Sequence, residues 1–528
     1  MMVRRRTPYD PSGPTLRLVA LVLTTALAGC VAVGPDYESP DASWLKAWET
    51  DLYGRVVTPA VADAPKADLR AWWRLFGDPK LDGLVAIARA NNPTLRIAGL
   101  RILESRAALG IASALRYPQL QQADGNLTYV DSHKSKGSDD RFFNYQAGMT
   151  IGWELDFWGR FQRGIESADA AFASSIFDQQ NAQVLLTAQV TNLYYAYRTI
   201  LLRIEIARKN AAIRERSFGI TSLLYEKGQK AELDLQRAKT QYLSTLATIP
   251  SLQIQQVQVR NALCVLLGRL PGALPELEDT LEPLPTLDPV GLAALPAELL
   301  LRRPDIRSAA ARVAIQSAQI GFAKADLYPR ISLFGNLSYS GNTLGGAPES
   351  LVLGIGPAFT WDLFNYGRIK SNVRVQDARL QQLIELFQDT LRRAARELDD
   401  AAIGIAKTME RKVPQSGATV AAFRSLELAN RRYQEGYENF QSVLDAQRQY
   451  ESTLQTELIN DSDHISAVIG FYAALGGGWR PTPTQELIPE PTRERMEARS
   501  DWDDLLRAPI DHPAIGADLA GQESSSHD

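Results

Sequence analysis

The sequence contains little cysteine and little histidine. Of 528 residues, two are cysteine and four are histidine. His133, His464, His512 and His527 are scattered without the spacing of a metal site, and no nucleophile motif accompanies them. The sequence therefore gives no reason to expect an enzyme, a metal or a bound cofactor. Cys264 follows Leu263 in an apolar stretch and is expected to be a buried small hydrophobe.

Strong charge and long apolar runs are also missing. The net charge is -4 at pH 7 with 22% charged residues, so a nucleic-acid partner is not expected. After residue 29, no apolar run approaches the ~20 residues that a membrane-spanning helix needs. If this chain crosses a membrane, we expect it to do so with β-strands.

Residues 1–29 are predicted to be a lipoprotein signal peptide. Arginines at 4, 5 and 6 precede an apolar run at 18–28 that is too short to span a bilayer. Small residues then end at Cys30, which resembles a bacterial lipoprotein signal and implies that Cys30 carries the lipid. An ordinary signal peptide with an incidental cysteine is the alternative. Val31, in place of aspartate, favours the outer membrane by the same resemblance.

Two related stretches, 143–160 and 351–368, have the period of a β-strand. In each, apolar side chains alternate with small or polar ones, with some apolar exceptions on the polar face of the second. Their length and single apolar face are typical of lipid-spanning barrel strands of ~9 to 11 residues. A half-exposed sheet in a soluble domain is the alternative. Further strands are expected near 120–130 and 331–339, with polar tips at 131–141 and 340–350.

These stretches belong to a duplication that covers most of the chain. Pro93 and Tyr117 recur 211 residues later, whereas Gly228 and Leu267 recur 208 residues later, which indicates one small deletion near the strands. The predicted segments are the signal peptide 1–29, an N-terminal anchor and equatorial segment 30–92, repeat 1 at 93–268, a Pro-rich equatorial linker 269–303, repeat 2 at 304–479, and a polar tail 480–528 expected to be poorly ordered.

Each repeat also contains a very long helical pattern. Apolar residues step by three and four through 160–226, which predicts a helix about 100 Å long that packs along its length. The corresponding stretch 368–434 contains Pro414, which we expect to kink the helix rather than reverse it. A return helix is expected from about residue 231, with a break at Pro250.

Four strands per chain are too few to close a membrane barrel. Such barrels begin at about eight strands, and each unpaired backbone group in lipid costs several kcal/mol. We therefore expect several copies to share one barrel, and small polar residues on the inner face favour three copies and twelve strands over two copies. An aromatic girdle is predicted at the strand–helix junctions, with ordinary core packing as the alternative: Trp153, Trp158, Trp361, Phe364 and Tyr366.

Several motifs together carry a family resemblance. They are VGPDY at 33–37, WW at 72–73, FGDP at 76–79, WELDFWGR at 153–160, VLDAQR at 443–448 and ALGGGW at 474–479. With these motifs the chain resembles the TolC-like outer-membrane efflux proteins, in the lipoprotein branch that serves resistance-nodulation-division drug pumps.

The resemblance implies a mixed α+β membrane protein. It implies a homotrimer whose twelve-stranded barrel in outer-membrane lipid continues into a periplasmic α-helical barrel. The implied partners are a periplasmic adaptor and an inner-membrane efflux transporter, for which the trimer would be the exit duct. A polypeptide secretion duct and a non-conducting periplasm-spanning lipoprotein are the alternatives, and the exported substrate is not predicted.

By the same resemblance, the far ends of the long helices hold a periplasmic gate. Motif matching assigns a constriction aspartate to Asp445, a gate arginine to Arg448, a latch tyrosine to Tyr433 and an acidic latch residue to Asp234. Tyr225 marks the first helix end. Glu438, Phe440 and Gln441 stand where relatives can have other gate residues, so the closing contacts stay open. A solvated i, i+3 ion pair is the alternative for Asp445 and Arg448.

Overall fold

The computed structural model describes residues 32–42, 68–133, 140–277, 281–287, 297–343 and 349–510. Cys30 and the signal peptide lie outside these residues. The chain forms two compact units. The first combines Met1–Pro40, Leu103–Ser174 and Ala309–Phe387, and it contains the β-sheet with the adjoining helix ends. The second unit combines the remaining segments, and the regular elements among its described residues are all helices.

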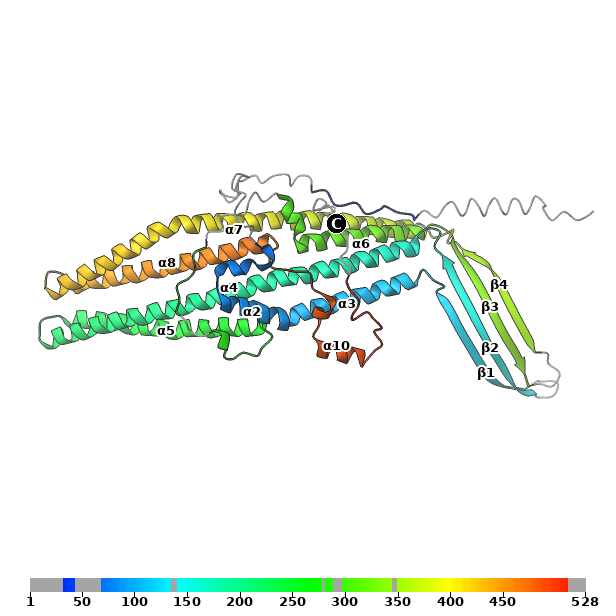
Figure 1. The fold of residues 1–528 in the computed structure, drawn as a ribbon, viewed down its shortest axis with the longest axis horizontal. Coiled ribbons are helices and arrows are strands. Elements are labelled where there is room, and N and C mark those ends of the chain that lie inside the picture. Colours follow the sequence, from blue (N-terminus) through cyan, green and yellow to red (C-terminus); the bar gives the residue numbers. More distant parts are fainter. Residues whose placement is uncertain are drawn as a thin grey trace, which may run out of the picture. The chain divides into compact units, whose positions relative to one another are not determined.

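The first unit contains one antiparallel sheet in the order β1-β2-β3-β4 (Figure 1). Its strands are β1 (Leu120–Ser132), β2 (Asp140–Leu155), β3 (Arg330–Asn342) and β4 (Ser350–Thr360). Met149 lies opposite Ala123 and Leu337, whereas the next residue, Thr150, lies opposite Gln122 and Asn336. Because successive side chains point to opposite sides, this register gives the sheet one mainly apolar face and one mainly polar face.

Helices of matching length occur in both halves of the chain. α3 (Pro93–Ala114) and α6 (Pro304–Ala325) have 22 residues each. α4 (Arg160–Glu226) and α7 (Arg368–Gln434) have 67 each, and α5 (Glu232–Leu266) and α8 (Phe440–Ala474) have 35 each. α7 continues through Pro414, so the prediction that the chain does not reverse there is confirmed. Within the described residues, no helix is both long and apolar enough to cross a membrane.

The predicted break at Pro250 is wrong, because α5 is continuous through it. Proline removes one backbone hydrogen bond, but the helix is held by packing on both sides of that position. Leu252 joins a buried cluster with Ile200 and Ile204 of α4, and Ile249 packs against the same cluster. Tertiary contacts with a long neighbouring helix thus outweigh the local penalty.

Both long helices end at a glycine in the left-handed conformation. Gly228 has φ +70° and Gly436 has φ +84°, values that favour glycine. The Gly228 N–H donates to the Tyr225 carbonyl at 2.8 Å, and the Tyr437 N–H donates to the Arg432 carbonyl at 2.9 Å. These bonds satisfy the last carbonyls of each helix, so the chain turns back directly into α5 or α8.

Short elements complete the second unit: η2 (Leu69–Phe76), α2 (Pro79–Asn91), η3 (Pro275–Leu277) and η4 (Ala297–Arg302). Asp78 caps α2 by accepting from the Lys80 N–H at 3.0 Å. The Trp72 ring stacks on Tyr472 with centroids 5.5 Å apart, which joins η2 to α8 in the core.

The expectation of a poorly ordered tail is wrong for residues 480–510. This segment forms α9 (Thr484–Leu487) and α10 (Glu490–Glu497). Four of its apolar side chains, Leu487, Ile488, Met496 and Leu506, are buried, whereas Trp502, Leu505 and Ile510 are half-buried. Charged residues and prolines separate these apolar side chains, so the average composition of the segment is polar. The composition therefore predicted disorder, although a few buried apolar residues hold the segment in place. Residues 511–528 lie outside the described part of the chain.

Candidate functional site

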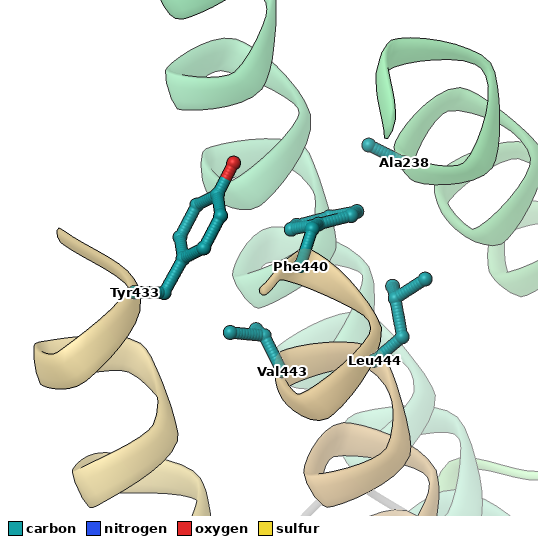
Figure 2. Close-up of a cluster of buried hydrophobic side chains, with 5 residues drawn as sticks. All are labelled: Ala238, Tyr433, Phe440, Val443 and Leu444. Carbon is teal, nitrogen blue, oxygen red and sulfur yellow. The ribbon is translucent and has the colours of Figure 1, made fainter. Parts of the chain in front are cut away.

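The end of the second helical hairpin contains a buried apolar cluster (Figure 2). Tyr433 comes from α7, Phe440, Val443 and Leu444 come from α8, and Ala238 comes from α5; each is at most 5% exposed. The rings of Tyr433 and Phe440 are 5.3 Å apart at their centroids. The cluster therefore joins the α7–α8 turn to α5, a helix of the other repeat.

Two charged groups of the first hairpin lie near Tyr433. The Lys230 ammonium is 4.8 Å from the centre of the Tyr433 ring, a cation–π contact. Burial raises the pKa of Tyr433, and the Asp234 carboxylate acts in the same direction, whereas the Thr221 hydroxyl opposes them. The structure thus brings together two of the predicted gate residues, Tyr433 and Asp234. Sequence reasoning missed Lys230, because its aromatic partner is some 200 residues away along the chain.

Asp445, Arg448 and Gln441 form a separate polar group on the surface of α8. One Asp445 carboxylate oxygen accepts from Arg448 at 3.1 Å and from Gln441 at 3.0 Å. The Asp445 and Arg448 side chains are 57% and 50% exposed. These contacts stay within one helix, at spacings of three and four residues. In the single chain, Asp445 and Arg448 thus form the solvated i, i+3 ion pair that the sequence offered as the alternative to a gate.

Glu438 lies in the turn between α7 and α8. Its carboxylate accepts from the Ser442 hydroxyl at 2.8 Å and lies 3.7 Å from the Arg432 guanidinium. Asn439 caps α8 by accepting from the Ser442 N–H at 3.0 Å. The acidic residue that departs from the family pattern therefore takes part in closing the turn and links the end of α7 to the start of α8.

Tyr225 occupies a different environment from its counterpart Tyr433. It lies 208 residues earlier at the same helix end, yet it is 39% exposed. At the positions of Phe440, Val443 and Leu444, the first hairpin has Glu232, Leu235 and Gln236. Because two of these three are polar or charged, the first helix end is less apolar at these positions, in agreement with the greater exposure of its tyrosine.

A buried polar contact below the cluster was not predicted. The Arg214 side chain of α4, 9% exposed, donates to Glu451 of α8 at 2.5 Å and to Thr245 of α5 at 2.5 Å. It also reaches the Gln241 carbonyl at 3.2 Å. One guanidinium thus holds three helices together. No local sequence signal marks it, since Glu451 is 237 residues away.

The aromatic residues at the strand–helix junctions make similar contacts in both repeats. Trp153 donates its indole N–H to the Arg116 carbonyl at 3.2 Å, and Trp361 donates to the Leu327 carbonyl at 3.0 Å. Trp158 stacks on Tyr328 with centroids 4.6 Å apart. Phe364 and Tyr366, by contrast, are almost fully exposed in the single chain. The indole N–H groups of Trp153 and Trp361 are thus hydrogen-bonded, and the rings of Phe364 and Tyr366 are exposed.

Comparison with known proteins identifies the family. A family model described as outer membrane efflux protein matches residues 84–269 and 295–477. The chain belongs to this family. The resemblance inferred from its motifs is confirmed.

Individual relatives match over most of their length. The solvent efflux pump outer membrane protein SrpC of Pseudomonas putida is 31% identical over 88% of this chain and 98% of its own. The cation efflux system protein CusC of Escherichia coli O157:H7 is 28% identical over 88% of this chain and 99% of its own. The solved outer-membrane channel OprN superposes with a TM-score of 0.75 at 30% identity, covering 85% of this chain and all of OprN.

As an outer membrane efflux protein, the chain acts in the outer membrane as an efflux channel. The predicted combination of many helices with a smaller number of strands is the fold of this family. The sheet, the long helices and the helix ends can therefore be interpreted as parts of such a channel.

Proposed function

We propose that three copies of this chain form the exit duct of a tripartite efflux system. The observation that carries the proposal is the two-faced sheet. On its apolar face, Leu351, Leu353, Ile355 and Phe359 of β4 are 68% to 81% exposed in the single chain. A contiguous apolar surface of this kind requires lipid or protein against it. The opposite face, with residues such as Gln122, Thr150 and Asn336, suits water.

The edges of the sheet explain why several copies are needed. In the described sheet, β1 and β4 each pair with only one neighbour. Unpaired edges are not tolerated in lipid, and β1 of one copy pairing with β4 of the next removes them. Three copies then form a closed barrel of twelve strands, which is wide enough to contain water.

The orientation follows from the proposed lipid anchor at Cys30. The Val33 N–H donates to the Trp158 carbonyl at 3.0 Å, so the described chain starts at the helix end of the sheet. A lipid on Cys30 therefore belongs in the periplasmic leaflet, with the long helices entering the periplasm. Trp153, Trp158, Trp361, Phe364 and Tyr366 then lie where an aromatic girdle meets the lipid headgroups.

We place the periplasmic gate at the ends of the long helices. The cluster around Tyr433 and Phe440 holds the second helix end against α5, next to Asp234. Asp445 and Arg448, with Gln441, lie on an exposed surface of α8, and threefold repetition would create a ring of carboxylates that attracts cations. Tyr225 and Glu438 complete the proposed gate at the two turns.

The partners of the duct are a periplasmic adaptor and an inner-membrane transporter. SrpC is named for solvents and CusC for cations, so relatives with similar identity to this chain serve different cargo. We infer small molecules or ions as the cargo class, because neither name refers to polypeptides. The other alternative, a non-conducting periplasm-spanning lipoprotein, is disfavoured because it gives the apolar face of the sheet no role.

The decisive test places one charge on either face of the sheet. Ile355→Arg puts it on the apolar face, where it costs ~2 to 4 kcal/mol in the middle of a bilayer. Ser338→Arg puts it on the polar face as the matched control. We expect Ile355→Arg to prevent heat-modifiable oligomers in outer-membrane fractions, and Ser338→Arg to leave them intact with conductance in planar bilayers. Equal assembly of both variants would overturn the proposal.

A further inference from the structure

The second unit contains a cavity of about 820 Å³ beside the C-terminal segment. Its walls come from η2, α2, the start of α3, part of α4 and residues 480–490. Five arginines line it: Arg70, Arg74, Arg89, Arg96 and Arg480. Its lining residues are more than 40 residues along the chain from Glu226 and Gln434, where the long helices end, so it is separate from the proposed gate.

Arg89 lies against the apolar part of this cavity. Its guanidinium is 4.5 Å from the centre of the Trp73 ring and donates to the Gly478 carbonyl at 2.5 Å and to the Thr187 hydroxyl at 3.2 Å. Its Nε is buried without a hydrogen-bond partner. Burial and the neighbouring arginines 480 and 74 lower the pKa of Arg89 to about 10. Like charges around a partly buried cation favour the binding of an anion.

The cavity wall has four carboxylates against five arginines. Glu486 pairs with Arg480 at 2.5 Å, and Glu490 pairs with Arg493, which does not line the cavity. Asp68 accepts from the Arg70 backbone N–H at 3.0 Å, and Asp82 is the remaining carboxylate. Within the described part of the chain, Arg96 donates only to neutral oxygens, those of Ala90 and Asn91. Positive charge therefore exceeds negative charge around the cavity.

The last described residues are bonded to a segment that contributes to the wall of this cavity. The Thr484 hydroxyl donates to the Ala508 carbonyl at 2.9 Å, and Thr484 lies between the cavity-lining residues Thr482 and Gln485. Leu506 is fully buried and fixes the segment nearby. Residue 511 thus follows three positions after a residue that is bonded to a neighbour of the cavity lining. At up to ~3.3 to 3.6 Å per residue, the 18 residues from 511 to 528 are long enough to span such a cavity.

The charge of residues 511–528 complements the arginines. This segment contains Asp511, Asp518, Glu523 and Asp528, and it has no lysine or arginine. Residues 43–67, another stretch outside the described part, have three basic and three acidic residues. We propose that residues 511–528 dock into this cavity, with their carboxylates against Arg74, Arg89 and Arg96. Docking ties the C-terminal segment to α2 and α3 by ion pairs.

A spin label on the segment tests the docking directly. Ser525→Cys is labelled in the full-length, detergent-purified oligomer, and protein without this substitution gives the background, since Cys264 is buried. We expect a slowly tumbling label at 0.1 M NaCl and a mobile one at 1 M, where the Debye length falls from ~10 to ~3 Å. Asp518→Asn with Glu523→Gln should mobilise it at low salt, as should Arg74→Gln. Arg216→Gln, an exposed arginine of α4, is the control.

A label that is equally mobile at both salt concentrations would overturn the proposal, as would immobility unaffected by the tail substitutions. A second measurement compares the modification of Arg74 by phenylglyoxal in the full chain and in a variant lacking 511–528. We expect Arg74 to react about threefold faster in the truncated protein, as loss of exposed ion pairing implies. Equal protection in both proteins would show that another segment or a second copy covers the cavity, and the proposal would fail.

Discussion

The two helix ends share a backbone but differ in their side chains. α4 and α7 have equal lengths, and each ends at a glycine with positive φ before a return helix of 35 residues. Tyr433 is nevertheless 5% exposed, whereas Tyr225 is 39% exposed. Repetition of the fold therefore sets where the chain turns. A few residue differences on the return helix determine which turn packs tightly against the neighbouring helices.

The polar contact made by Arg214 follows the same asymmetry. The positions that correspond to Arg214 and Glu451 in the other repeat are Ala422 and Leu243. Alanine and leucine cannot form an ion pair, so the Arg214–Glu451 pair has no counterpart at these equivalent positions. The first hairpin supplies the cation, and the second supplies the carboxylate. The two hairpins are thus distinct parts of the gate region, each with its own set of contacts.

The largest expected effect comes from removing the Phe440 ring, because the corresponding residue of the first hairpin, Glu232, is not aromatic. Phe440→Ala should destabilise this end by about 3 to 5 kcal/mol, because a buried aromatic is lost from a packed cluster. Glu232→Ala, at the corresponding exposed position, should cost less than about 0.5 kcal/mol. Trypsin cleavage after Arg431 and Arg432, followed by mass spectrometry, measures local opening. Equal cleavage rates in both variants would show that the two ends do not differ in this way.

Arg214→Ala should destabilise the helical unit by about 3 kcal/mol, since it leaves the Glu451 carboxylate without its partner in a partly buried site. Replacing both residues by methionine should restore most of that loss, because no unpaired charge remains. Thermal unfolding followed by circular dichroism measures both variants. If the double variant is no more stable than Arg214→Ala, the ion pair is not the source of the effect.

The raised pKa of Tyr433 predicts a pH dependence confined to the second helix end. A tyrosine that is harder to ionise in the closed state stabilises that state fully below its ordinary pKa of about 10. This stability is lost as the pH rises through the raised value, because the opened state releases its proton first. Trypsin cleavage at Arg432 should accelerate above pH 10, relative to sites elsewhere in the chain. Tyr433→Phe should remove the acceleration, and its persistence in that variant would exclude Tyr433 as the cause.

The smallest effect on stability is expected from the exposed pair of Asp445 and Arg448. Asp445→Asn should cost about 0.3 to 0.5 kcal/mol. Glu427→Gln, which breaks the comparable pair with Arg424 on α7, is the control. In planar bilayers, Asp445→Ala combined with Tyr433→Phe should raise single-channel conductance, whereas Glu427→Gln should not. Unchanged conductance would remove Asp445 and Tyr433 from the gate and leave a solvated ion pair.

Periodic patterns and glycine positions predicted most of the fold. The strands, the 67-residue helices and the return helix from about residue 231 depend on local periodicity and backbone freedom, which the sequence displays directly. Pro250 and the segment 480–510 were wrongly predicted because their conformation depends on distant packing. A proline is a strong local signal, and no local pattern shows that Ile249 and Leu252 pack on α4.

The candidate site was less predictable than the fold. Resemblance led to Tyr433 and Asp234, which the structure places near each other, and to Asp445 and Arg448, which it places on an exposed helix surface. Lys230 and Arg214 were missed because their partners are far away in sequence. The burial of Tyr433 depends on Phe440 and Leu444, whose role appears only when the two hairpins are compared.

The central claim is that one chain is only a part of a closed channel. Native mass spectrometry of the lipidated protein, released from detergent micelles, tests it most directly. We predict a mass three times that of the single lipidated chain. A monomer that retains its β-structure in detergent would contradict it, because the edges of β1 and β4 would then be stable without a second copy.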